Sequence, residues 1–434
     1  MAVMMMGASH HNASIDFLEC LAIEPACIQS VLQSICDLEE IDEAVLINTC
    51  NRKEVYISSR DPEGARDALR HTIACLSRQT GAELDVSLKT LEDEDAARHL
   101  FTVACGLDSM VVGEQQILGQ VRDAMAASLD AGASGPVLNK LFRQAIHTGR
   151  TVRQHTTISE GAHSTVTVAL DLAKRYLPKE GSRVLIYGAG MIGGMAARTL
   201  AGLENKPDLK PSEVHIANRT EWKAEELAER LSARVPHTYA MPLDLDHPSE
   251  IDHVIGGVDL LVTSTDIAFP VFTKERIARI RKGNPNPLVI VDLAVPRDVA
   301  PEVDELDNVR LFGIDSLRSV VTDGPSAKAI EDTCGFIEQA VGEFTAWTYG
   351  QSVEPTITAM RQRAEEIRRH QLERVASKLG DLTEEQRKAI EVLTHGMVNQ
   401  FLHSPTVKLK QSAQTPDGEG HARTLAALFD LDVS

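Results

Sequence analysis

The sequence predicts a multidomain α/β protein, with an α+β domain at residues 1–157, a parallel α/β domain at 158–316 and an all-α domain at 317–434. Three observations support this fold class. The chain has 434 residues, enough for two or three domains. Short apolar runs alternate with helical stretches through the middle region. Beyond about Leu317 these runs disappear, and Ala, Glu, Arg, Gln and Leu predominate.

The first region mixes strand-like and helix-like stretches. The sequences AVLINTC (44–50) and KEVYIS (53–58) predict two strands joined by a tight turn at Cys50, Asn51 and Arg52. A helical pattern runs from Leu107 to Ala126. On that expected helix Glu114 falls on the apolar stripe, and one polar face is shared by Ser109, Gly113, Gln116 and Gln120.

The middle region contains four short apolar runs, RVLIYGAG (183–190), EVHIANR (213–219), DLLVTST (259–265) and PLVIVDLA (287–294). Near-continuous β-branched runs that alternate with helices predict a parallel sheet covered on both faces. In the last region Pro355 is expected to break the chain before a long helix over 356–377. A further helix is expected over 382–403, with Thr383 as its N-cap and Pro405 beyond its end.

Composition limits the possible functions. The chain carries 44 Lys and Arg against 63 Asp and Glu, a formal charge of -19 that disfavours a broad nucleic-acid surface. An aromatic share of 4% argues against a base-stacking surface for single strands. Seven cysteines without a CxxC pair exclude the usual zinc-finger spacings and favour reduced thiols, so we expect a cytoplasmic protein. No segment reaches the ~18 apolar residues of a membrane span.

A glycine-rich motif predicts a Rossmann-type dinucleotide site. It comprises Gly188, Ala189, Gly190, Met191, Ile192 and Gly193, between a strand and an Ala-rich helix. The next strand ends Asn218-Arg219-Thr220, without the Asp or Glu that binds a ribose 2′-hydroxyl. An arginine there suits a 2′-phosphate, which favours NADP(H) over NAD(H). A purely structural glycine turn and a solvated loop arginine are the alternatives.

Three further side chains are candidates for chemistry, each with a structural alternative. Cys50 ends a strand beside Arg52, which could lower the pKa of its thiol, although most lone cysteines are inert and buried. His99 could act as an acid or base, or be a satisfied core residue. Glu114 either faces a cleft with a cationic partner or sits at the stripe's edge and reaches water.

Several segments together resemble the glutamyl-tRNA reductase family, the first committed enzymes of five-carbon tetrapyrrole and haem synthesis. They are INTCNRKEVY (47–56), GLDSMVVGEQQILGQVRDA (106–124), GAGMIG (188–193), ANRT (217–220), VDLAVPRDV (291–299) and LHSPTVKLK (402–410). The resemblance implies a catalytic domain, an NADPH domain and a helical dimerisation domain on one long spinal helix, assembled as a homodimer.

The resemblance also implies roles for particular residues. Cys50 is then the nucleophile, and His99 matches the family's activity-critical histidine. Arg52 would hold a substrate carboxylate, and Glu114 would bind the α-ammonium group. The implied substrate-recognition positions are Thr49, Cys50, Asn51, Arg52, Ser109, Glu114, Gln115, Gln116 and Gln120.

The implied chemistry is a reduction through a covalent thioester. Cys50 attacks the ester of glutamyl-tRNA(Glu), and NADPH reduces the resulting thioester to glutamate-1-semialdehyde. No metal is expected, and His10-His11 do not share a face. The family's next enzyme, glutamate-1-semialdehyde aminomutase, is an implied partner. Two competing hypotheses are a shikimate-dehydrogenase-type oxidoreductase and a non-catalytic tRNA-binding scaffold.

Two clusters of basic residues could bind tRNA although the chain as a whole is acidic. One contains Lys140, Arg143, Arg150 and Arg153, and the other contains Arg361, Arg363, Arg368, Arg369 and Arg374. Both could contact tRNA phosphates. The alternative is salt-bridged helix faces, since Glu365, Glu366 and Glu373 are interspersed.

Overall fold

The computed structural model describes residues 1–77, 84, 86–159, 165–178, 181–203, 209–314, 316, 325–380, 382–413 and 418–431. These form two compact units, Ala2–Ile337 and Glu338–Ser434. The three-domain division stays a prediction, and its second boundary, at residue 317, lies outside the described residues. Across the described ranges, no helix is long and apolar enough to cross a membrane.

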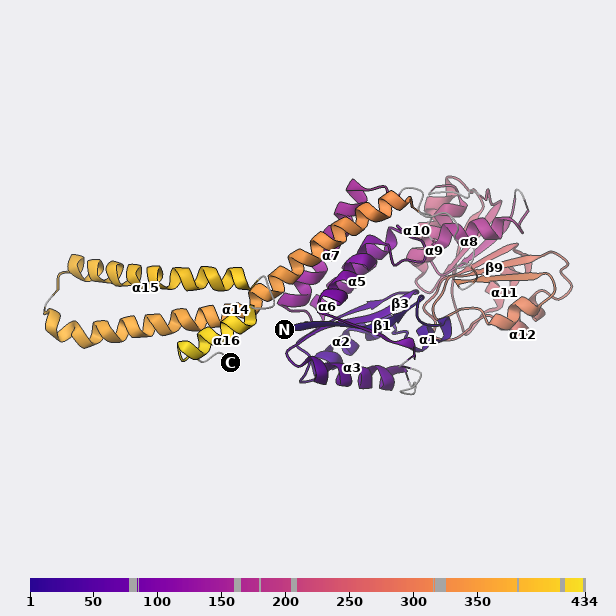
Figure 1. Ribbon diagram of the computed structural model, residues 1–434. Helices are drawn as coiled ribbons and strands as arrows, with labels where there is room; N and C mark the ends of the chain where they lie inside the picture. The colour runs from indigo at the N-terminus through magenta and orange to yellow at the C-terminus, as the bar shows by residue number, and fades with distance from the viewer. Residues whose placement is uncertain are drawn as a thin grey trace. The chain divides into compact units, whose positions relative to one another are not determined.

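An antiparallel sheet organises the N-terminal part of the first unit. Its strands lie in the order β2-β3-β1-β4, with bounds β1 Ala2–Ser9, β2 Glu43–Asn48, β3 Arg52–Ser59 and β4 Lys89–Glu92. One face carries α1 (Ile15–Cys20), α2 (Ile28–Cys36) and α3 (Pro62–Ser77), and the other carries α5 (Asp93–Cys105), α6 (Gln116–Asp130) and α7 (Pro136–His155) (Figure 1). The expected strands at 44–50 and 53–58 are confirmed, whereas β1 was not anticipated.

The expected helix from Leu107 to Ala126 is wrong in its first half. Helix α5 ends at Cys105, and Gly106 caps it in the left-handed conformation with φ 82°. Gly113 also has a positive φ of 86°, so the chain follows an irregular loop until α6 begins at Gln116. Both positions use backbone conformations that glycine adopts easily, and they interrupt a pattern whose periodicity alone is helical.

A six-stranded parallel sheet forms the second half of this unit. The strand order is β10-β9-β8-β5-β6-β7, which is the doubly wound arrangement of a Rossmann fold. The strands are β5 Arg183–Tyr187, β6 Glu213–Asn218, β7 Thr238–Pro242, β8 Leu260–Thr263, β9 Leu288–Asp292 and β10 Val309–Gly313. The four expected strands of this region are therefore confirmed, and β7 and β10 are additional.

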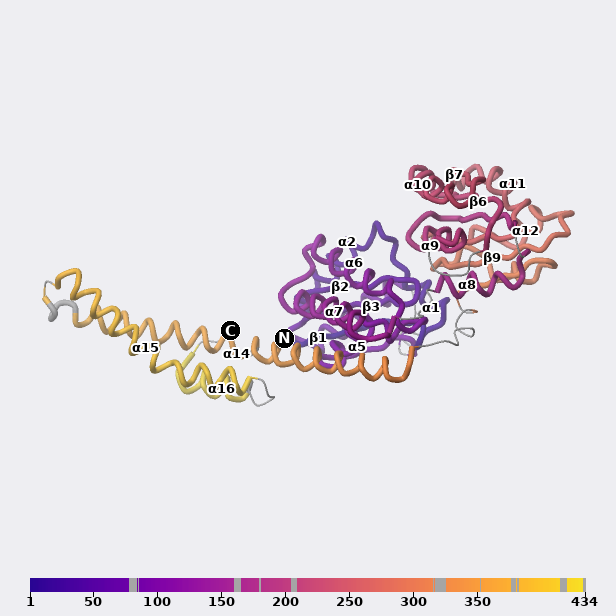
Figure 2. The backbone as a smooth tube through the Cα atoms, turned by 90° about the horizontal axis from the view of Figure 1, so that it is seen from above, coloured from indigo at the N-terminus to yellow at the C-terminus, as the bar shows by residue number. Residues whose placement is uncertain are grey.

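Helices cover both faces of the parallel sheet (Figure 2). The helices are α8 Thr165–Lys174, α9 Met191–Leu200, α10 Glu221–Ser232, α11 Ser249–Gly257 and α12 Lys274–Ile280. Alternate residues of β5 separate into two cores: Val184 and Ile186 pack with α8, α9 and α10, while Leu185 and Tyr187 pack with α11 and α12. Burial on both faces explains the continuous apolar runs.

Long helices make up the C-terminal part of the chain, as expected. They are α14 Ala327–Leu379, α15 Glu384–Ser412 and α16 Gly418–Leu428. Thr383 is the N-cap of α15 in a complete capping box with Gln386, which confirms the expected start of that helix.

Neither internal proline ends a helix, contrary to expectation. Pro355 lies inside α14 and Pro405 inside α15. Val353 and Ile357 flank the first proline and form one buried cluster with Leu409 of α15. A proline inside a helix removes a backbone hydrogen bond and costs about 3 kcal/mol. The free energy gained by burying these apolar side chains offsets that cost.

Candidate active site

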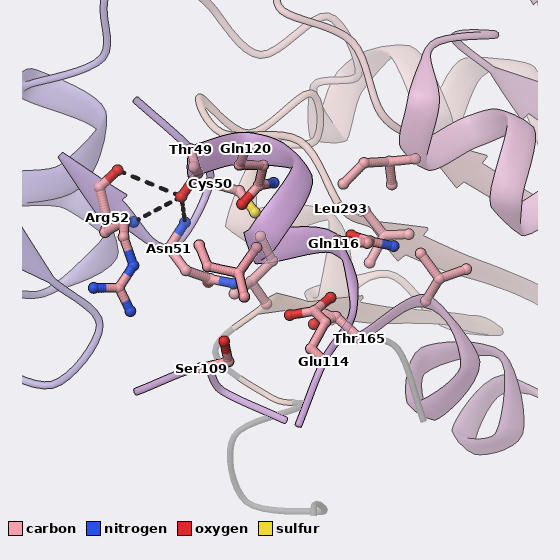
Figure 3. A pocket seen from close by; sticks show the side chains of 14 residues that line it. Thr49, Cys50, Asn51, Arg52, Ser109, Glu114, Gln116, Gln120, Thr165 and Leu293 are labelled. Carbon is pink, nitrogen blue, oxygen red and sulfur yellow. Dashed lines mark hydrogen bonds between the residues drawn. The ribbon is translucent and has the colours of Figure 1, made fainter. Parts of the chain in front are cut away.

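Cys50 lies in the tight turn of the β2–β3 hairpin. The strands end at Asn48 and resume at Arg52, and Thr49 N donates to Arg52 O at 2.9 Å. The Thr49 hydroxyl accepts from Asn51 N and Arg52 N at 3.3 and 3.2 Å (Figure 3). These bonds fix the turn, so the thiol stands at the end of a rigid strand pair rather than on a free loop.

The turn faces a cleft whose walls come from both halves of the unit. The N-terminal half contributes Thr49, Cys50, Asn51, Arg52, Ser109, Glu114, Gln116, Ile117 and Gln120, and the second half contributes Thr165, Val166, Ile192, Leu293 and Ile314 (Figure 3). Eight of the nine predicted recognition positions therefore line one cleft. Gln115 does not line it, because it is exposed at the start of α6.

These residues meet through a loop, not through a shared helix face. Ser109 and Glu114 lie in the 106–115 loop, whereas Gln116 and Gln120 lie on α6. Arg153 of α7 holds this loop by donating to Ala104 O and Glu114 O, each at 2.9 Å. The two terminal nitrogens of Arg153 thus bond to the protein backbone, and its contact with tRNA phosphates stays a prediction.

Arg52 is at the centre of a buried ion network. Its side chain is 1% exposed, with Nη1 donating to Glu54 Oε1 at 2.7 Å and Nη2 donating to Asp108 O at 2.6 Å and Oδ2 at 2.9 Å. Tyr56 also donates to Glu54, at 3.1 Å. Burial raises the pKa of Glu54, but Arg52 and the hydrogen bond from His99 outweigh it and lower that pKa to about 2. Arg52 thus already donates one hydrogen bond to each of two protein carboxylates.

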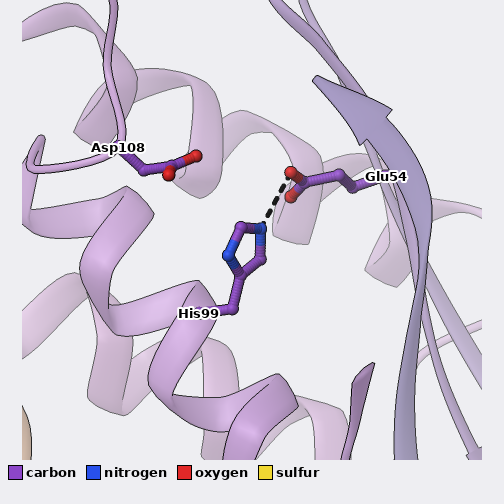
Figure 4. A group of neighbouring side chains, drawn as sticks. All are labelled: Glu54, His99 and Asp108. Carbon is purple, nitrogen blue, oxygen red and sulfur yellow. Dashed lines mark hydrogen bonds and ion pairs between the residues drawn. The ribbon is translucent and has the colours of Figure 1, made fainter. Parts of the chain in front are cut away.

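His99 belongs to the same network and does not line the cleft. Its Nε2 lies 3.0 Å from Glu54 Oε1, and because an ionised carboxylate can only accept, Nε2 must carry the hydrogen (Figure 4). Glu54, His99 and Asp108 lie close enough to one another for metal binding, yet Arg52 already binds both carboxylates. His99 therefore contacts Cys50 only indirectly, through Glu54, Arg52 and the turn.

The surroundings of Cys50 do not lower the pKa of its thiol, contrary to expectation. Burial and the nearby carboxyl of Glu114 raise that pKa to about 11, against the lowering effect of Lys53 and Arg52. Arg52 has little effect because its charge is balanced by Glu54 and Asp108. The thiol is protonated in this state of the molecule and needs a further change of charge to react.

Glu114 is the carboxyl group in the cleft, and the structure resolves its two alternatives in favour of the cleft. The residue is 8% exposed, and burial raises its pKa to about 7, although a backbone hydrogen bond from Thr165 and the charge of Arg52 lower it. Among the described residues, Glu114 forms no ion pair with a cationic side chain. A buried carboxyl without a cation is suited to bind a cationic ligand group.

The glycine motif has the geometry of a pyrophosphate site. Gly188 has a φ of 106°, and a Cβ at Gly193 would stand 1.8 Å from Gly188 O, so both positions require glycine. Gly190 caps α9 without a side-chain bond, and a Cβ there would meet nothing within 4 Å. The first turn of α9 thus opens onto free space, as an anion at a helix N-terminus requires.

The residues at the end of β6 have separate tasks. Asn218 accepts from Ala189 N at 2.9 Å and donates to Thr220 O at 2.9 Å, so it braces the glycine loop. The Arg219 side chain is 67% exposed, with its nearest acid, Asp266, at 3.9 Å. Arg219 remains available for a phosphate, whereas Asn218 supports the loop.

The sequence analysis missed Glu54, Asp108 and Lys53, all of which lie around the turn. A signal was present for two of them: Lys53 and Glu54 are charged residues inside the predicted strand 53–58, where most side chains are apolar. Charges in a buried strand need partners or a function. Asp108 had no such signal, because its partner lies 56 residues away in the chain.

Family models and related proteins cover the chain almost completely. The model described as Glutamyl-tRNAGlu reductase, N-terminal domain, matches residues 6–156, and the model for the dimerisation domain matches 334–431. Between them, a Shikimate / quinate 5-dehydrogenase model matches 171–320. The similarity to shikimate dehydrogenases is thus confined to this middle part of the chain.

Whole-chain relatives share one description. The glutamyl-tRNA reductase of Salinispora arenicola is 36% identical over 441 residues, covering 100% of this chain and 93% of the relative. That of Carboxydothermus hydrogenoformans is 34% identical, covering 100% and 94%. The solved structure of glutamyl-tRNA reductase from Methanopyrus kandleri shares 26% identity over 99% of each chain, with a TM-score of 0.50.

Proposed function

Because this chain belongs to the glutamyl-tRNA reductase family, we propose that it reduces glutamyl-tRNA(Glu) to glutamate-1-semialdehyde through a thioester on Cys50. One observation carries the proposal: a single cleft brings Cys50 and Glu114 together with Ile192 of the glycine motif. A nucleophile, a site for the substrate amine and a dinucleotide loop thus converge on one space.

Substrate binding can activate the thiol. Glu114 is the acidic group that raises the pKa of Cys50, after burial itself. An α-ammonium group paired with Glu114 would cancel this charge, so the pKa of Cys50 would fall when glutamyl-tRNA binds. The thiolate would then attack the ester carbonyl and expel the terminal ribose hydroxyl of the tRNA, leaving a glutamyl thioester.

The remaining cleft residues orient the glutamyl group. Ser109, Gln116 and Gln120 supply polar side chains around the cleft, with Thr49 and Asn51 at the turn. Both terminal nitrogens of Arg52 already bond to protein carboxylates. We therefore assign Arg52 to holding the turn and supplying positive potential, while the amide and hydroxyl groups contact the substrate carboxylate.

His99 is a positioning residue in this scheme. It bonds to Glu54, which bonds to Arg52, the residue that closes the Cys50 turn. Loss of His99 would loosen this chain of contacts and misplace the thiol.

A nucleotide cofactor is supported by the Rossmann strand order and by the family model over 171–320. We propose that it is NADPH, which supplies the hydride when bound. The backbone of the glycine motif from Gly188 to Gly193 would hold the pyrophosphate, and exposed Arg219 would bind the 2′-phosphate. Two-electron reduction of the thioester then yields the aldehyde and restores the Cys50 thiol.

The family model for the dimerisation domain supports a homodimer. We propose that the second copy covers the apolar groove between α14 and α15, where Ile367, Met397 and Phe401 are 52%, 63% and 68% exposed. Arg368 lines this groove and bonds to Glu365 and to Thr394, at 3.2 Å. Arg368 therefore links α14 to α15, and its contact with tRNA stays a prediction.

Lys140, Arg143 and Arg150 remain candidate contacts for the tRNA backbone, since Arg143 and Arg150 are exposed on α7. Transfer of the aldehyde to glutamate-1-semialdehyde aminomutase follows from the family resemblance and stays a prediction. The cytoplasmic location stays a prediction as well.

The decisive experiment is intact-protein mass spectrometry after mixing the protein with glutamyl-tRNA in the absence of NADPH. Wild-type protein should gain one glutamyl group that hydroxylamine removes. Cys50→Ser should gain none, whereas Cys334→Ser, which alters an exposed thiol, should behave as wild type. Unmodified wild-type protein that also fails to oxidise NADPH would overturn the proposal and favour a tRNA-binding scaffold.

A further inference from the structure

A second cavity lies on the face of the antiparallel sheet opposite to the Arg52 network. Its volume is about 560 Å³, within the range of small-molecule sites. The walls come from β1, β2 and β3 and from the segments around α1, α2 and α3. They are chiefly aliphatic, with Leu21, Ile23, Val31, Leu46, Val55 and Leu76 among the lining side chains.

Lys53 is the buried cation of this cavity. The residue is 7% exposed and lines the wall beside Val55. Among the residues that the structure describes, its ammonium group takes part in no hydrogen bond or ion pair. Glu24, the other charged residue on the wall, is exposed and does not pair with it. A largely buried lysine whose ammonium group has no partner is costly, so a protein that keeps one normally uses it.

A second uncommitted polar group lies next to Lys53. Asn48 and Lys53 are direct cross-strand partners, so their side chains point to the same face of the sheet. The Asn48 amide donates to Ile23 O at 2.7 Å, but its Oδ1 is buried without a partner. Asn48 does not line the cavity, and its acceptor cannot bond to an anion, so Lys53 is the polar anchor of the site.

We propose that this cavity binds a linear aliphatic carboxylate, with the carboxylate on the Lys53 ammonium and the chain along the aliphatic walls. The ligand class follows from the lining: one cation demands one anionic head, and flexible aliphatic side chains fit an alkyl chain. No aromatic side chain is found among the described residues that line the cavity, so a flat ring system would lack stacking partners. The cavity and the Cys50 cleft share no lining residue, although the Lys53 charge also acts on the Cys50 thiol. The proposal does not depend on the proposed reaction.

Two thiols on the cavity wall report occupancy. Cys20 and Cys27 both line the cavity and are exposed enough to be alkylated. Cys334 is also exposed but lies outside it, so it serves as an internal reference. A ligand in the cavity should slow alkylation of the first two thiols and leave the reference unchanged.

The test uses the full chain with decanoate as the probe and decan-1-ol as its uncharged counterpart. Calorimetry should show one decanoate per chain, bound about tenfold tighter than the alcohol, because a charge-assisted hydrogen bond contributes at least that factor. Bound decanoate should slow iodoacetamide labelling of Cys20 and Cys27, as followed by peptide mass spectrometry. Absence of decanoate binding, or binding without protection of either thiol, would overturn the proposal.

Variants of two lysines on the same sheet identify the anchor. Lys53→Met should bind decanoate no more tightly than decan-1-ol, while Lys89→Met, which removes an exposed lysine from β4, should bind as wild type. Lys53→Gln gives the same comparison if the methionine variant folds poorly. A Lys53 variant that keeps the tenfold preference for the carboxylate would show that the cavity is not the site.

Discussion

The two faces of strand β3 bury charge in opposite ways. Arg52, Glu54 and Tyr56 point toward α5 and α7, where Tyr56 packs edge-on against Phe142 with ring centroids 5.4 Å apart. Lys53 points the other way, into the face whose core holds Val55 and Ile57. Alternation along a strand places these consecutive residues on opposite sides of one sheet.

The difference between the faces lies in their partners. On the α5 side the buried charges of Arg52 and Glu54 have counter-charges, and the resulting network fixes the turn that carries Cys50. On the α2 side a single cation stands beside an aliphatic cavity. A buried charge is costly on either face of the sheet. On the α5 side ion pairs offset this cost and hold the turn rigidly, whereas on the α2 side the Lys53 charge is left to bind an anionic ligand.

The largest effect on stability is expected from Glu54→Gln, which removes the ion pair between Arg52 and Glu54. Removing one partner of a buried ion pair leaves Arg52 undercompensated, at a cost of about 3–5 kcal/mol in the free energy of unfolding. Urea denaturation measures this cost, and Glu63→Gln, an exposed acid on α3, is the matched control. A loss below about 1 kcal/mol would mean that the network is not the support of the turn.

This contribution has a defined pH window. The pKa of Glu54 falls from 4.5 to about 2 on folding, so its stabilising effect is complete above pH 4.5 and is lost as the pH falls toward 2. Glu54→Gln should therefore lie below wild type in stability at pH 7, and the two proteins should converge in strong acid.

A gain in stability is expected from Lys53→Met, which removes the buried charge on the α2 side of the sheet. Burial lowers the pKa of Lys53 from 10.5 to about 8, although the Cys50 thiol opposes this shift. The unfolded state thus binds the proton more tightly, and the penalty is complete below pH 8. At pH 7 the variant should gain on the order of 3 kcal/mol in unfolding free energy.

The pH dependence of the gain tests its cause. As the pH rises from 8 to 10.5 the wild-type penalty fades, so the two proteins should approach each other over that window. Thermal denaturation at pH 7 and pH 10 measures this difference. A gain of equal size at both values would point to better packing by methionine, not to a desolvated charge.

The smallest effect is expected at His99, which sharpens the distinction between support and catalysis. His99→Leu removes a hydrogen bond to a charged group, worth about 2 kcal/mol in unfolding free energy. His99→Gln keeps a donor for Glu54, so it should recover most of the stability and most of the reductase activity. Equal loss of activity in both variants, without a change in stability, would instead make His99 a direct acid or base.

Local sequence patterns predicted the regular elements well. The runs at 183–190, 213–219, 259–265 and 287–294 each contain a strand of the parallel sheet, because strands buried on both faces require continuous apolar sequence. The glycine turn between β5 and α9 lies where the sequence predicted it, since a Cβ at Gly193 cannot be accommodated, and its role in binding a dinucleotide stays a prediction. The capping box at Thr383 likewise marks the start of α15.

Patterns failed where distant contacts decide the outcome. Periodicity extended a helix across 107–115, where Gly106 and Gly113 turn the chain and Arg153 holds the loop from another helix. Local rules also predicted helix boundaries at Pro355 and Pro405. Both helices continue through their proline, because side chains near the two prolines pack in one buried cluster.

The sequence alone determined the strands, the dinucleotide loop and the position of Cys50 in a tight turn, because each depends on residues that are neighbours in the chain. Only the tertiary structure decided which charges are paired. Arg52 meets Asp108 and His99 meets Glu54 across 56 and 45 residues, while Lys53 forms no ion pair within the described part of the chain. The energy of a buried charge depends on the groups that folding brings around it, and the order of residues along the chain does not specify those groups.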